Sequence, residues 1–374
     1  MNEINIISFD VPFPANYGGV IDVFYKIKYF HSKGIKIHLH CFEYGRGEQP
    51  ELEKYCVSVN YYQRKKGLPS LLSLTPYIVK SRVSAQLKAN LLKNNFPIFF
   101  EGLHTCFLLN DIAFKNRVKI FRSHNIEHHY YHNLAVAEKN ITKRQYYQSE
   151  AKKLLHFEPI IKNATVSLVV SLTDLTYFKN KYPKSRFEFV PCFHAKEEVT
   201  VKLGKGNYVL YHGNLSVPEN KNAVEFIIQQ LFKALTIPLI IAGLNPPTDL
   251  IQLVKKYHHI SLIANPNDQE MNELISNAQI NLLYTNQATG LKLKLLNVLY
   301  NGRHCIVNSK MVEGTSLSEL CSVEDDISEL KKLIMTNFIS EVSTQEIEKR
   351  KVALLRDYSN ESSYQKIIET LQSF

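Results

Sequence analysis

The sequence contains no tryptophan, only four methionines and no long uninterrupted apolar run. A helix that spans a bilayer needs about 18 to 20 predominantly apolar residues, and no stretch approaches that length. The N-terminal residues, MNEINIISFD, lack the basic start and the apolar stretch of a signal peptide. We therefore expect a cytoplasmic protein that touches the inner face of the cytoplasmic membrane, if at all, only peripherally.

Cysteines are few and scattered. No two of the six have the CxxC spacing of zinc ribbons or redox motifs, which argues against a structural zinc site and against a disulfide scaffold. Several stand in apolar runs and are expected to be small buried side chains in a reducing compartment. The six are Cys41, Cys56, Cys106, Cys192, Cys305 and Cys321.

A chain of 374 residues is long enough for two domains, and its hydrophobic share of 45% is that of a globular protein. The formal net charge of +10 suits an anionic partner such as a nucleotide phosphate, an anionic membrane or a nucleic acid. Charge alone does not choose among these three, and it also aids solubility.

The chain opens with alternating strand and helix patterns. A loop with the pair Gly18-Gly19 joins the first predicted strand to the first predicted helix. This loop lacks the GxGxxG spacing of a dinucleotide site. Such a loop either lets a ligand approach the backbone or is an ordinary tight turn. The predicted elements are strand Ile4–Phe9, loop Pro12–Val20, helix Val20–His31 and strand Ile35–Phe42.

Polar residues follow the next two predicted strands, Pro97–Glu101 and Val118–Arg122. Ligands bind outside the carboxyl ends of strands in open α/β sheets, so Glu101, His104 and His124 are candidates by position. A histidine there can accept a proton or donate a hydrogen bond to a sugar hydroxyl.

The segment HNIEH, from His124 to His128, also fits the HxxEH pattern of some zinc proteases. That chemistry needs both histidines on one helical turn. A strand is predicted directly before His124, which favours a strand end over a helix, and five-residue patterns arise often by chance. We expect no metal site, and a zinc protease is the least favoured alternative.

The strand and helix pattern restarts after a polar segment, His194–Asn207, which is the natural linker. Strand Tyr208–Tyr211 leads into a loop with Gly213 and Asn214, and a later strand leads into a loop that begins at Gly243. Both halves are thus predicted to be doubly wound α/β domains that face one another across a cleft.

The segment Ile280–Gly314 is a predicted strand, polar loop, helix and strand, with Thr289 as the expected N-cap of the helix. The positive end of a helix dipole attracts phosphate, and Gly290 would let it approach the backbone. Lys294 and Asn297 share a helical face with Gly290, while Lys292 is near enough to reach the loop. The alternative is that the lysines are only the solvated face of an amphipathic helix.

These motifs carry a resemblance. The segment TGLKLKLLNVLYNGRHCIV is similar to the donor-site segment of GT-B glycosyltransferases of family 4, a group of retaining sugar transferases. The loop YHGNLSVPENKNA resembles the loop that opens the nucleotide domain of that family. The segments EGLHT and HNIEHHYYHNLA resemble a bacterial subgroup of mannosyltransferases.

The resemblance implies two Rossmann-like domains. Residues 1–195 would bind the acceptor and 206–354 the nucleotide sugar, and a C-terminal helix at about 355–374 would pack back on the first domain. The residues that it places in the site are, for catalysis, His124, Lys292 and Lys294; for the donor, Gly213, Asn214, Gly243, Thr289, Gly290, Leu291 and Asn297; and for the acceptor, Gly18, Gly19, Glu101 and His104.

The sequence departs from the family at three positions. The two glutamates of the family's donor motif correspond to Thr289 and Asn297, and the phosphate-binding arginine corresponds to Asn214. An amide still hydrogen-bonds a ribose hydroxyl, and Lys292 or Lys294 can replace the missing cation. Donor binding is therefore expected, while the retaining outcome is open.

The expected reaction is transfer of a hexosyl unit, mannosyl among the candidates, from a GDP- or UDP-linked sugar to a saccharide or polyprenyl-linked acceptor. It would serve cell-surface polysaccharide or glycan synthesis, without a cofactor, a metal or a nucleic-acid partner. The basic, proline-broken segment Arg64–Arg82 could lie on an anionic membrane, or be a buried loop with a solvated basic end. The rivals are a non-catalytic GT-B partner subunit and a GT-B sugar-nucleotide epimerase.

Overall fold

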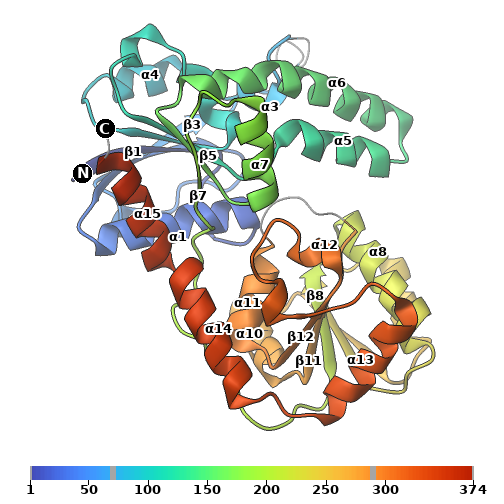
Figure 1. The fold of residues 1–374 in the computed structure, drawn as a ribbon. Helices are drawn as coiled ribbons and strands as arrows, with labels where there is room; N and C mark the ends of the chain where they lie inside the picture. Colours follow the sequence, from blue (N-terminus) through green and yellow to red (C-terminus); the bar gives the residue numbers. More distant parts are fainter. Residues whose placement is uncertain (1, 68–72, 287–291, 373–374) are drawn as a thin grey trace. The chain divides into compact units, whose positions relative to one another are not determined.

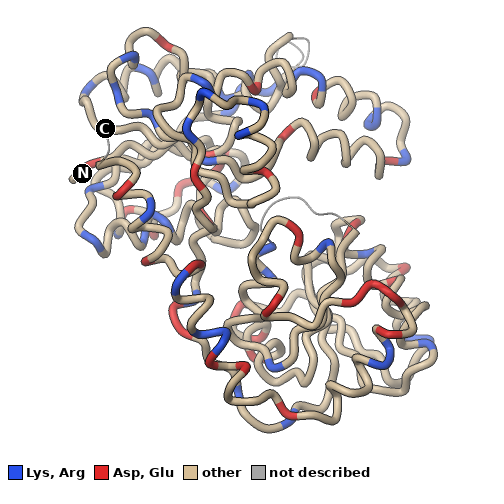
Figure 2. Tube along the Cα trace, viewed as in Figure 1, with Lys and Arg blue, Asp and Glu red and all other residues tan. Residues whose placement is uncertain are grey.

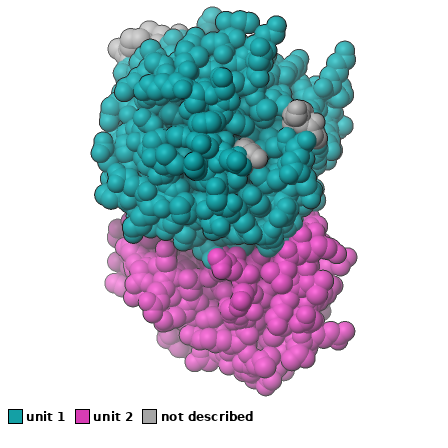
Figure 3. All heavy atoms as spheres, turned by 90° about the vertical axis from the view of Figure 1, so that its left-hand side faces the viewer, with its two compact units in different colours: residues 1–195, 289–291, 358–374 teal, residues 196–288, 292–357 magenta. Residues whose placement is uncertain are grey.

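The structure, a computed structural model, describes residues 2–67, 73–286 and 292–372. The chain forms two compact units (Figures 1 and 3). Unit 1 consists mainly of residues 1–195 and 358–374, and unit 2 of residues 196–288 and 292–357. Within the described ranges, no helix is both long and apolar enough to cross a membrane. Basic and acidic residues are interspersed over both units (Figure 2).

Unit 1 is built on a sheet of seven described strands, all parallel, in the order β3-β2-β1-β4-β5-β6-β7. This is the Rossmann order, in which the chain first winds to one side of β1 and then to the other. The strands are β1 Glu3–Ser8, β2 Lys36–Glu43, β3 Ser58–Gln63, β4 Ile98–Glu101, β5 Lys119–Ser123, β6 Val166–Val169 and β7 Phe187–Phe189.

Helices cover both faces of this sheet, and each face buries its own apolar cluster (Figure 1). The helices are α1 Gly18–Ser32, α3 Tyr77–Lys80, α4 Ala85–Leu91, α5 Glu127–Ala137, α6 Ile141–Phe157, α7 Leu172–Lys181 and α15 Asn360–Gln372, with 3-10 turns η1 Pro50–Lys54, η2 Leu103–Leu108, η3 Ile112–Phe114 and η4 Glu158–Asn163.

Two helix boundaries in unit 1 differ from the prediction. Helix α1 begins at Gly18, so Gly18 and Gly19 form its first turn and not a loop. The segment Ala137–Ile161, rich in Lys, Glu, Gln and Tyr, predicts one long helix, but α5 ends at Ala137 and α6 begins anew behind Asn140, whose side chain caps it.

Helix α15 belongs to unit 1 although it lies at the end of the chain. Asn360 donates to the carbonyl of His194 at 2.8 Å and accepts from the His194 N–H at 3.0 Å. Ile367 is fully buried in the same apolar cluster as Phe30, and the Tyr364 ring packs edge-on against Phe30. The helix thus closes one face of the first sheet.

Unit 2 repeats the Rossmann order with six described parallel strands, β10-β9-β8-β11-β12-β13. The two-residue strand β13 was not predicted, because Ser322–Val323 is too short to show a period. The strands are β8 Val209–Asn214, β9 Leu239–Leu244, β10 Ile260–Ala264, β11 Ile280–Leu283, β12 His304–Val307 and β13 Ser322–Val323.

An acidic residue before a helical pattern predicts Asp268 as the N-cap of α10, but the structure has a capping box between Asn267 and Glu270, so the N-cap is Asn267. The helices of this unit are α8 Pro218–Phe226, continued by the π-helical turn η5 Ile227–Phe232, then α9 Thr248–Val254, α10 Asp268–Asn277, α11 Leu293–Asn301, α12 Ser309–Val312, the 3-10 turn η6 Ser318–Leu320, α13 Ile327–Ile339 and α14 Thr344–Asp357.

Candidate active site

Each sheet has one point where its strand order reverses, and ligands of doubly wound folds bind outside the carboxyl ends of the strands there. In unit 1 the point lies between β1 and β4, and in unit 2 between β8 and β11. Most of the predicted site residues follow these strands directly. The topology therefore brings them to two edges, one in each unit.

A pair of lysines marks the edge of unit 2. Lys292 is the N-cap of α11, and Lys294 lies in its first turn. Lys292 approaches Glu219 in the first turn of α8, with 4.0 Å between its Nζ and a carboxylate oxygen, and the charge of Glu219 also acts on Lys294. Thr285, just beyond β11, donates a hydrogen bond to the same carboxylate. Two cations thus share one counterion.

Burial makes this pair sensitive to an added anion. It lowers the pKa of Lys294 to about 8, with Glu219 opposing and Lys292 reinforcing the shift. It also lowers the pKa of Lys292, again opposed by Glu219. The Lys294 Nζ lies 3.3 Å from Oδ1 of Asn220 and 5.4 Å from the centre of the Tyr211 ring. A bound diphosphate would add negative charge beside these two ammonium groups, for which Glu219 is the shared counterion.

The predicted donor loop is close-packed. An added Cβ at Gly243 would lie 1.8 Å from the carbonyl oxygen of Gly213, and one at Gly213 would lie 3.1 Å from the Asn220 side chain. Both glycines therefore allow β8, β9 and α8 to approach one another. The Asn214 side chain accepts hydrogen bonds from the N–H and hydroxyl of Ser216, so it shapes the turn after β8.

The start of α11 differs from the prediction. The helix begins at Leu293, later than the expected N-cap Thr289. Thr289, Gly290 and Leu291 lie outside the described residues. Asn297 is half-buried, and its side-chain oxygen accepts a hydrogen bond of 2.8 Å from Asn301.

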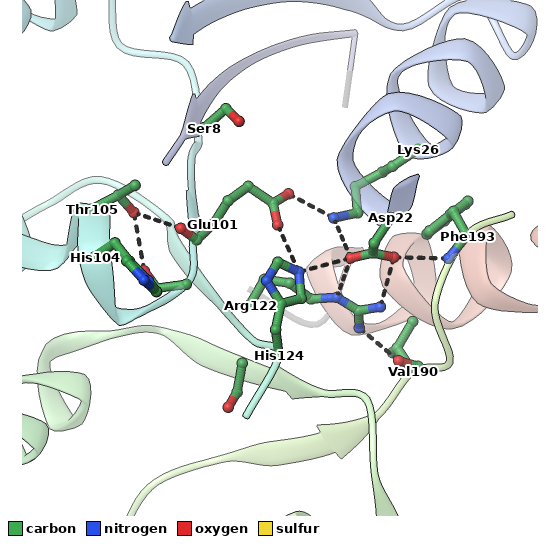
Figure 4. Close-up of polar contacts among 12 residues, drawn as sticks. Ser8, Asp22, Lys26, Glu101, His104, Thr105, Arg122, His124, Val190 and Phe193 are labelled. Carbon is green, nitrogen blue, oxygen red and sulfur yellow. Dashed lines mark hydrogen bonds and ion pairs between the residues drawn. The ribbon is translucent and has the colours of Figure 1, made fainter. Parts of the chain in front are cut away.

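Unit 1 holds a buried charged cluster at its reversal point (Figure 4). The Asp22 carboxylate accepts hydrogen bonds of 3.0 Å from two nitrogens of the Arg122 guanidinium and one of 3.2 Å from the Lys26 ammonium. Lys26 also binds Glu101 at 2.6 Å. The His124 Nε2 lies 3.0 Å from Asp22 and 3.4 Å from Glu101. All but His124 are fully buried.

These contacts determine the state of His124. Burial raises the pKa of Asp22, but Arg122, Lys26 and His124 together lower it well below its usual range. Nε2 of His124 therefore carries a proton and donates to a carboxylate. Burial lowers the pKa of His124, yet its hydrogen bonds to Asp22 and Glu101 outweigh this and raise it. The Nδ1 edge of this 12% exposed ring has no hydrogen bond to the described residues.

Glu101 was predicted to face a ligand, but its carboxylate is buried against Lys26 and His124 and supports the histidine instead. Asp22, Glu101 and His124 also have metal-ligand spacing, with one ligand atom of each within 4.8 Å of the others. The Lys26 ammonium already occupies the place of a cation between the two carboxylates, at 2.6 and 3.2 Å. A divalent ion would add charge to a balanced cluster.

The zinc-protease reading of HNIEH is wrong. His124 lies between β5 and α5 and is bound to Asp22, while His128 lies within α5 and its Nδ1 is 2.9 Å from Glu158. The two rings thus have separate carboxylate partners and do not form a ligand pair.

The first-turn glycines and His104 surround one aromatic ring. An added Cβ at Gly19 would lie 2.6 Å from the Phe9 ring, and Gly18 precedes it at the start of α1. The centre of the Phe9 ring lies 5.3 Å from that of His104 and 5.7 Å from that of His124. Gly19 therefore makes room for Phe9, whose ring contacts both histidines.

The predicted basic segment turns inward at its end. Arg82 is 5% exposed and donates to the carbonyls of Phe9 and Ile78. Arg64 is half-buried and stacks on Tyr44 with 4.1 Å from its guanidinium carbon to the ring centre. Neither arginine is a fully solvated surface charge, and residues 68–72 lie outside the described ranges.

Sequence reasoning missed three of the five cluster residues, Asp22, Lys26 and Arg122, together with Glu219 in unit 2. The four-residue spacing of Asp22 and Lys26 was a readable signal for an ion pair on one helix face. The pairing of Asp22 with Arg122 joins residues 100 positions apart, which no local pattern reveals.

No protein-family model matches the chain. The chain is 26% identical over 357 residues to an uncharacterised 44.6 kDa protein in the cps region of Klebsiella pneumoniae, covering 89% of this chain and 90% of that protein.

Among solved structures, the chain is similar to HepE of Anabaena in complex with UDP and glucose, with a TM-score of 0.67, 12% identity and complete coverage of both chains. It is also similar to a sucrose-phosphate synthase from Thermosynechococcus elongatus, with a TM-score of 0.70, 12% identity, and coverage of 100% of this chain and 99% of that one. These likenesses confirm the predicted GT-B fold with its two Rossmann-like domains.

Proposed function

We propose that this protein is a glycosyltransferase that binds a nucleotide diphosphate sugar at the lysine pair of unit 2. The observation that carries the proposal is the arrangement of Lys292 and Lys294, two half-buried lysines that both feel the charge of Glu219, at the reversal point of a Rossmann sheet. Structures of HepE, which shares the fold, contain UDP and UDP-glucose, which favours the same ligand class here.

The chemistry follows from the charge. Breaking the glycosidic bond leaves negative charge on the nucleoside diphosphate. Ammonium groups held in place before the reaction stabilise that charge without reorganisation. In unit 1, His124 would offer its Nδ1 edge to the sugar or the acceptor, while Asp22 and Glu101 fix the orientation of its ring.

We further propose a hexosyl donor, mannosyl among the candidates, linked to GDP or UDP, and a saccharide or polyprenyl-linked acceptor. Membership of family 4, a retaining outcome without a metal, and a place in cell-surface polysaccharide or glycan synthesis are parts of this proposal that rest on the resemblance. The family's donor motif has glutamates where this chain has Thr289 and Asn297. Glu219, on another helix, supplies a carboxylate beside Lys292 in their place.

A thermal-shift panel tests the proposal. Purified protein is heated with UDP, GDP, ADP, CMP or dTDP, each alone and as a sugar conjugate. A ligand that binds only the folded state raises the unfolding temperature, so one nucleotide class should raise it clearly. The absence of a shift with every nucleotide would refute the proposed donor site.

Variants locate the binding site. Charge-assisted hydrogen bonds contribute about 1.5 to 3 kcal/mol each, so Lys292→Ala and Lys294→Ala should each weaken nucleotide binding by roughly 10- to 100-fold. Lys332→Ala removes the same charge from an ammonium that is 70% exposed on α13, and it should bind like the parent protein. Equal binding by all three variants would place the nucleotide elsewhere.

A further inference from the structure

Two cysteines stand side by side at the edge of the second sheet. Strands β12 and β13 pair in parallel, with Ile306 opposite Ser322. Cys305 and Cys321 each precede these residues by one position. The backbone at Cys321 is extended, with φ −127° and ψ 157°, as in a strand. The register, continued by one residue, therefore places Cys305 opposite Cys321.

The spacing of neighbouring strands suits a disulfide bond. Adjacent strands lie about 4.7 to 4.9 Å apart, and the Cα atoms of disulfide-bonded cysteines are usually about 4.4 to 6.8 Å apart. Residues at the same register position point to the same face of a sheet. Cys305 and Cys321 line one cavity together, which agrees with a shared face. A hydrogen bond with Cys305 raises the pKa of Cys321, and burial adds to the shift.

None of the other four cysteines stands opposite a thiol in the strand pairings of the described residues. Cys41 on β2 lies opposite Tyr61 of β3, so Cys56 is out of register with it. Cys106 lies in the turn η2, and Cys192 lies beyond the end of β7. The pairing of Cys305 with Cys321 is thus a specific property of the edge of unit 2.

The cavity gives a small polar oxidant access to the pair. Its volume is about 90 Å³, and one water needs about 10 to 15 Å³ of such space, so hydrogen peroxide fits. Cys305 is 2% exposed, whereas Cys321 is partly exposed and is the outer thiol. The buried Arg350 also lines the cavity, and its charge opposes the rise in the pKa of Cys321. Arg350 thus favours the thiolate, which is the form that attacks a peroxide.

We propose that Cys305 and Cys321 form a redox-active pair, which a peroxide oxidises to a disulfide bond between β12 and β13. The Cys321 sulfur attacks one peroxide oxygen, the O–O bond breaks, and hydroxide leaves with the thiol proton as water. The Cys305 sulfur then attacks the sulfenic sulfur of Cys321. The S–S bond forms, the S–O bond breaks, and the second thiol proton leaves in a second water. The two thiols supply the two electrons that reduce the peroxide.

The bond would fasten a short edge strand. Strand β13 has two residues and is the last strand of the described sheet. The chain between the two cysteines contains α12 and η6, and the bond would close this segment into a loop. A cross-link restricts the unfolded chain, so oxidation should stabilise unit 2. The pair lies at the amino end of β12, away from the strand ends that precede the lysine pair, so this inference does not rest on the proposed function.

Mass spectrometry of the full chain tests the pair. Reduced protein is treated with hydrogen peroxide, its remaining thiols are alkylated in urea, and it is digested without a reductant. Forming the bond removes two hydrogen atoms, about 2 Da, and four of the six cysteines should then be alkylated. One cross-linked peptide should join Cys305 to Cys321, and dithiothreitol should release it.

Variants keep the test decisive. Cys321→Ser removes the outer thiol and Cys305→Ala the buried one, and each should abolish the cross-link. Cys56→Ser is the matched control, because it also removes a partly exposed thiol, and it should form the cross-link like the parent protein. Oxidation should raise the urea midpoint of the parent and of Cys56→Ser, but not that of Cys321→Ser.

Three results would overturn the proposal, whatever the nucleotide panel shows. The first is a parent protein that keeps all six thiols open to alkylation after peroxide treatment. The second is oxidation of Cys305 or Cys321 to sulfinic acid without a cross-link. The third is a cross-link that pairs either of them with another cysteine.

Discussion

Replacing Glu127 by glutamine should change how the stability of the protein depends on pH. Burial raises the pKa of this carboxyl from its ordinary 4.5 to about 7, with Asp174 adding to the shift and His124 and Arg82 opposing it. Between these two pH values the unfolded chain has released the proton and the folded chain has kept it. The free energy of unfolding contributed by Glu127 therefore falls as pH rises from about 4.5, and the fall is complete above about 7.

The size of the effect follows from the pKa difference of about 2.5, which corresponds to about 3 kcal/mol. The stability of Glu127→Gln minus that of the parent protein should thus grow by about 3 kcal/mol between pH 4.5 and pH 8. A constant offset from the new amide does not alter this slope. Because the chain has no tryptophan, urea unfolding is followed by far-ultraviolet circular dichroism at a series of pH values.

Glu158→Gln is the control, because the pKa of Glu158 is shifted in the opposite direction to that of Glu127. Burial raises the pKa of Glu158, but hydrogen bonds from His128, Lys181 and Tyr182 together lower it to about 2. Its stabilising effect is present above pH 4.5 and disappears only as pH falls through about 2. This variant should be less stable than the parent by a nearly constant amount, about 3 kcal/mol, from pH 4.5 to pH 8. A difference for Glu127→Gln that is equally flat would refute the reasoning.

Three further predictions concern the two reversal points. UDP binding, measured by calorimetry, should weaken as pH rises through about 8, because Lys294 loses its proton there; binding that is constant from pH 7 to pH 9 would contradict this. Gly243→Ala forces a methyl group against the Gly213 carbonyl oxygen and should cost about 3 kcal/mol of stability in urea unfolding; an unchanged midpoint would contradict the packing. Asp22→Asn leaves the buried Arg122 without its counterion and should cost about 3 to 5 kcal/mol by the same assay; a loss below about 1 kcal/mol would show that the cluster is not tightly coupled.

The architecture was predictable because buried parallel strands are short apolar runs that alternate with amphipathic helices. The strand pattern over Ile280–Tyr284 and the helical spacing of Leu295, Val298 and Leu299 are both local properties, and the structure shows β11 and α11 there. Boundaries were harder to predict. Gly18 and Gly19 looked like a loop because glycine is a poor helix former, whereas close packing against Phe9 is what favours glycine at position 19 in that helix turn.

The candidate sites were predictable only in part. Position after a strand pointed to His104 and His124, and a positive helix start pointed to Lys292 and Lys294. Asp22 was not among the candidates, because its partner Arg122 is 100 positions away in the sequence. Glu127 stands inside the HNIEH pattern, and its burial, which raises its pKa, becomes visible only in three dimensions.

Because α15 belongs to unit 1, the two units are not completed in the order in which the ribosome begins them. When Ala195 leaves the ribosome, the first sheet is complete, but Phe30 and its neighbours lack the cover that Tyr364 and Ile367 provide. Roughly 180 residues must still be added, which takes about 10 to 40 s at the usual 5 to 20 residues per second. Unit 2 is meanwhile complete by Asp357. The unit that is started first is thus closed last, and a truncation before α15 would expose an apolar face of unit 1 while leaving unit 2 whole.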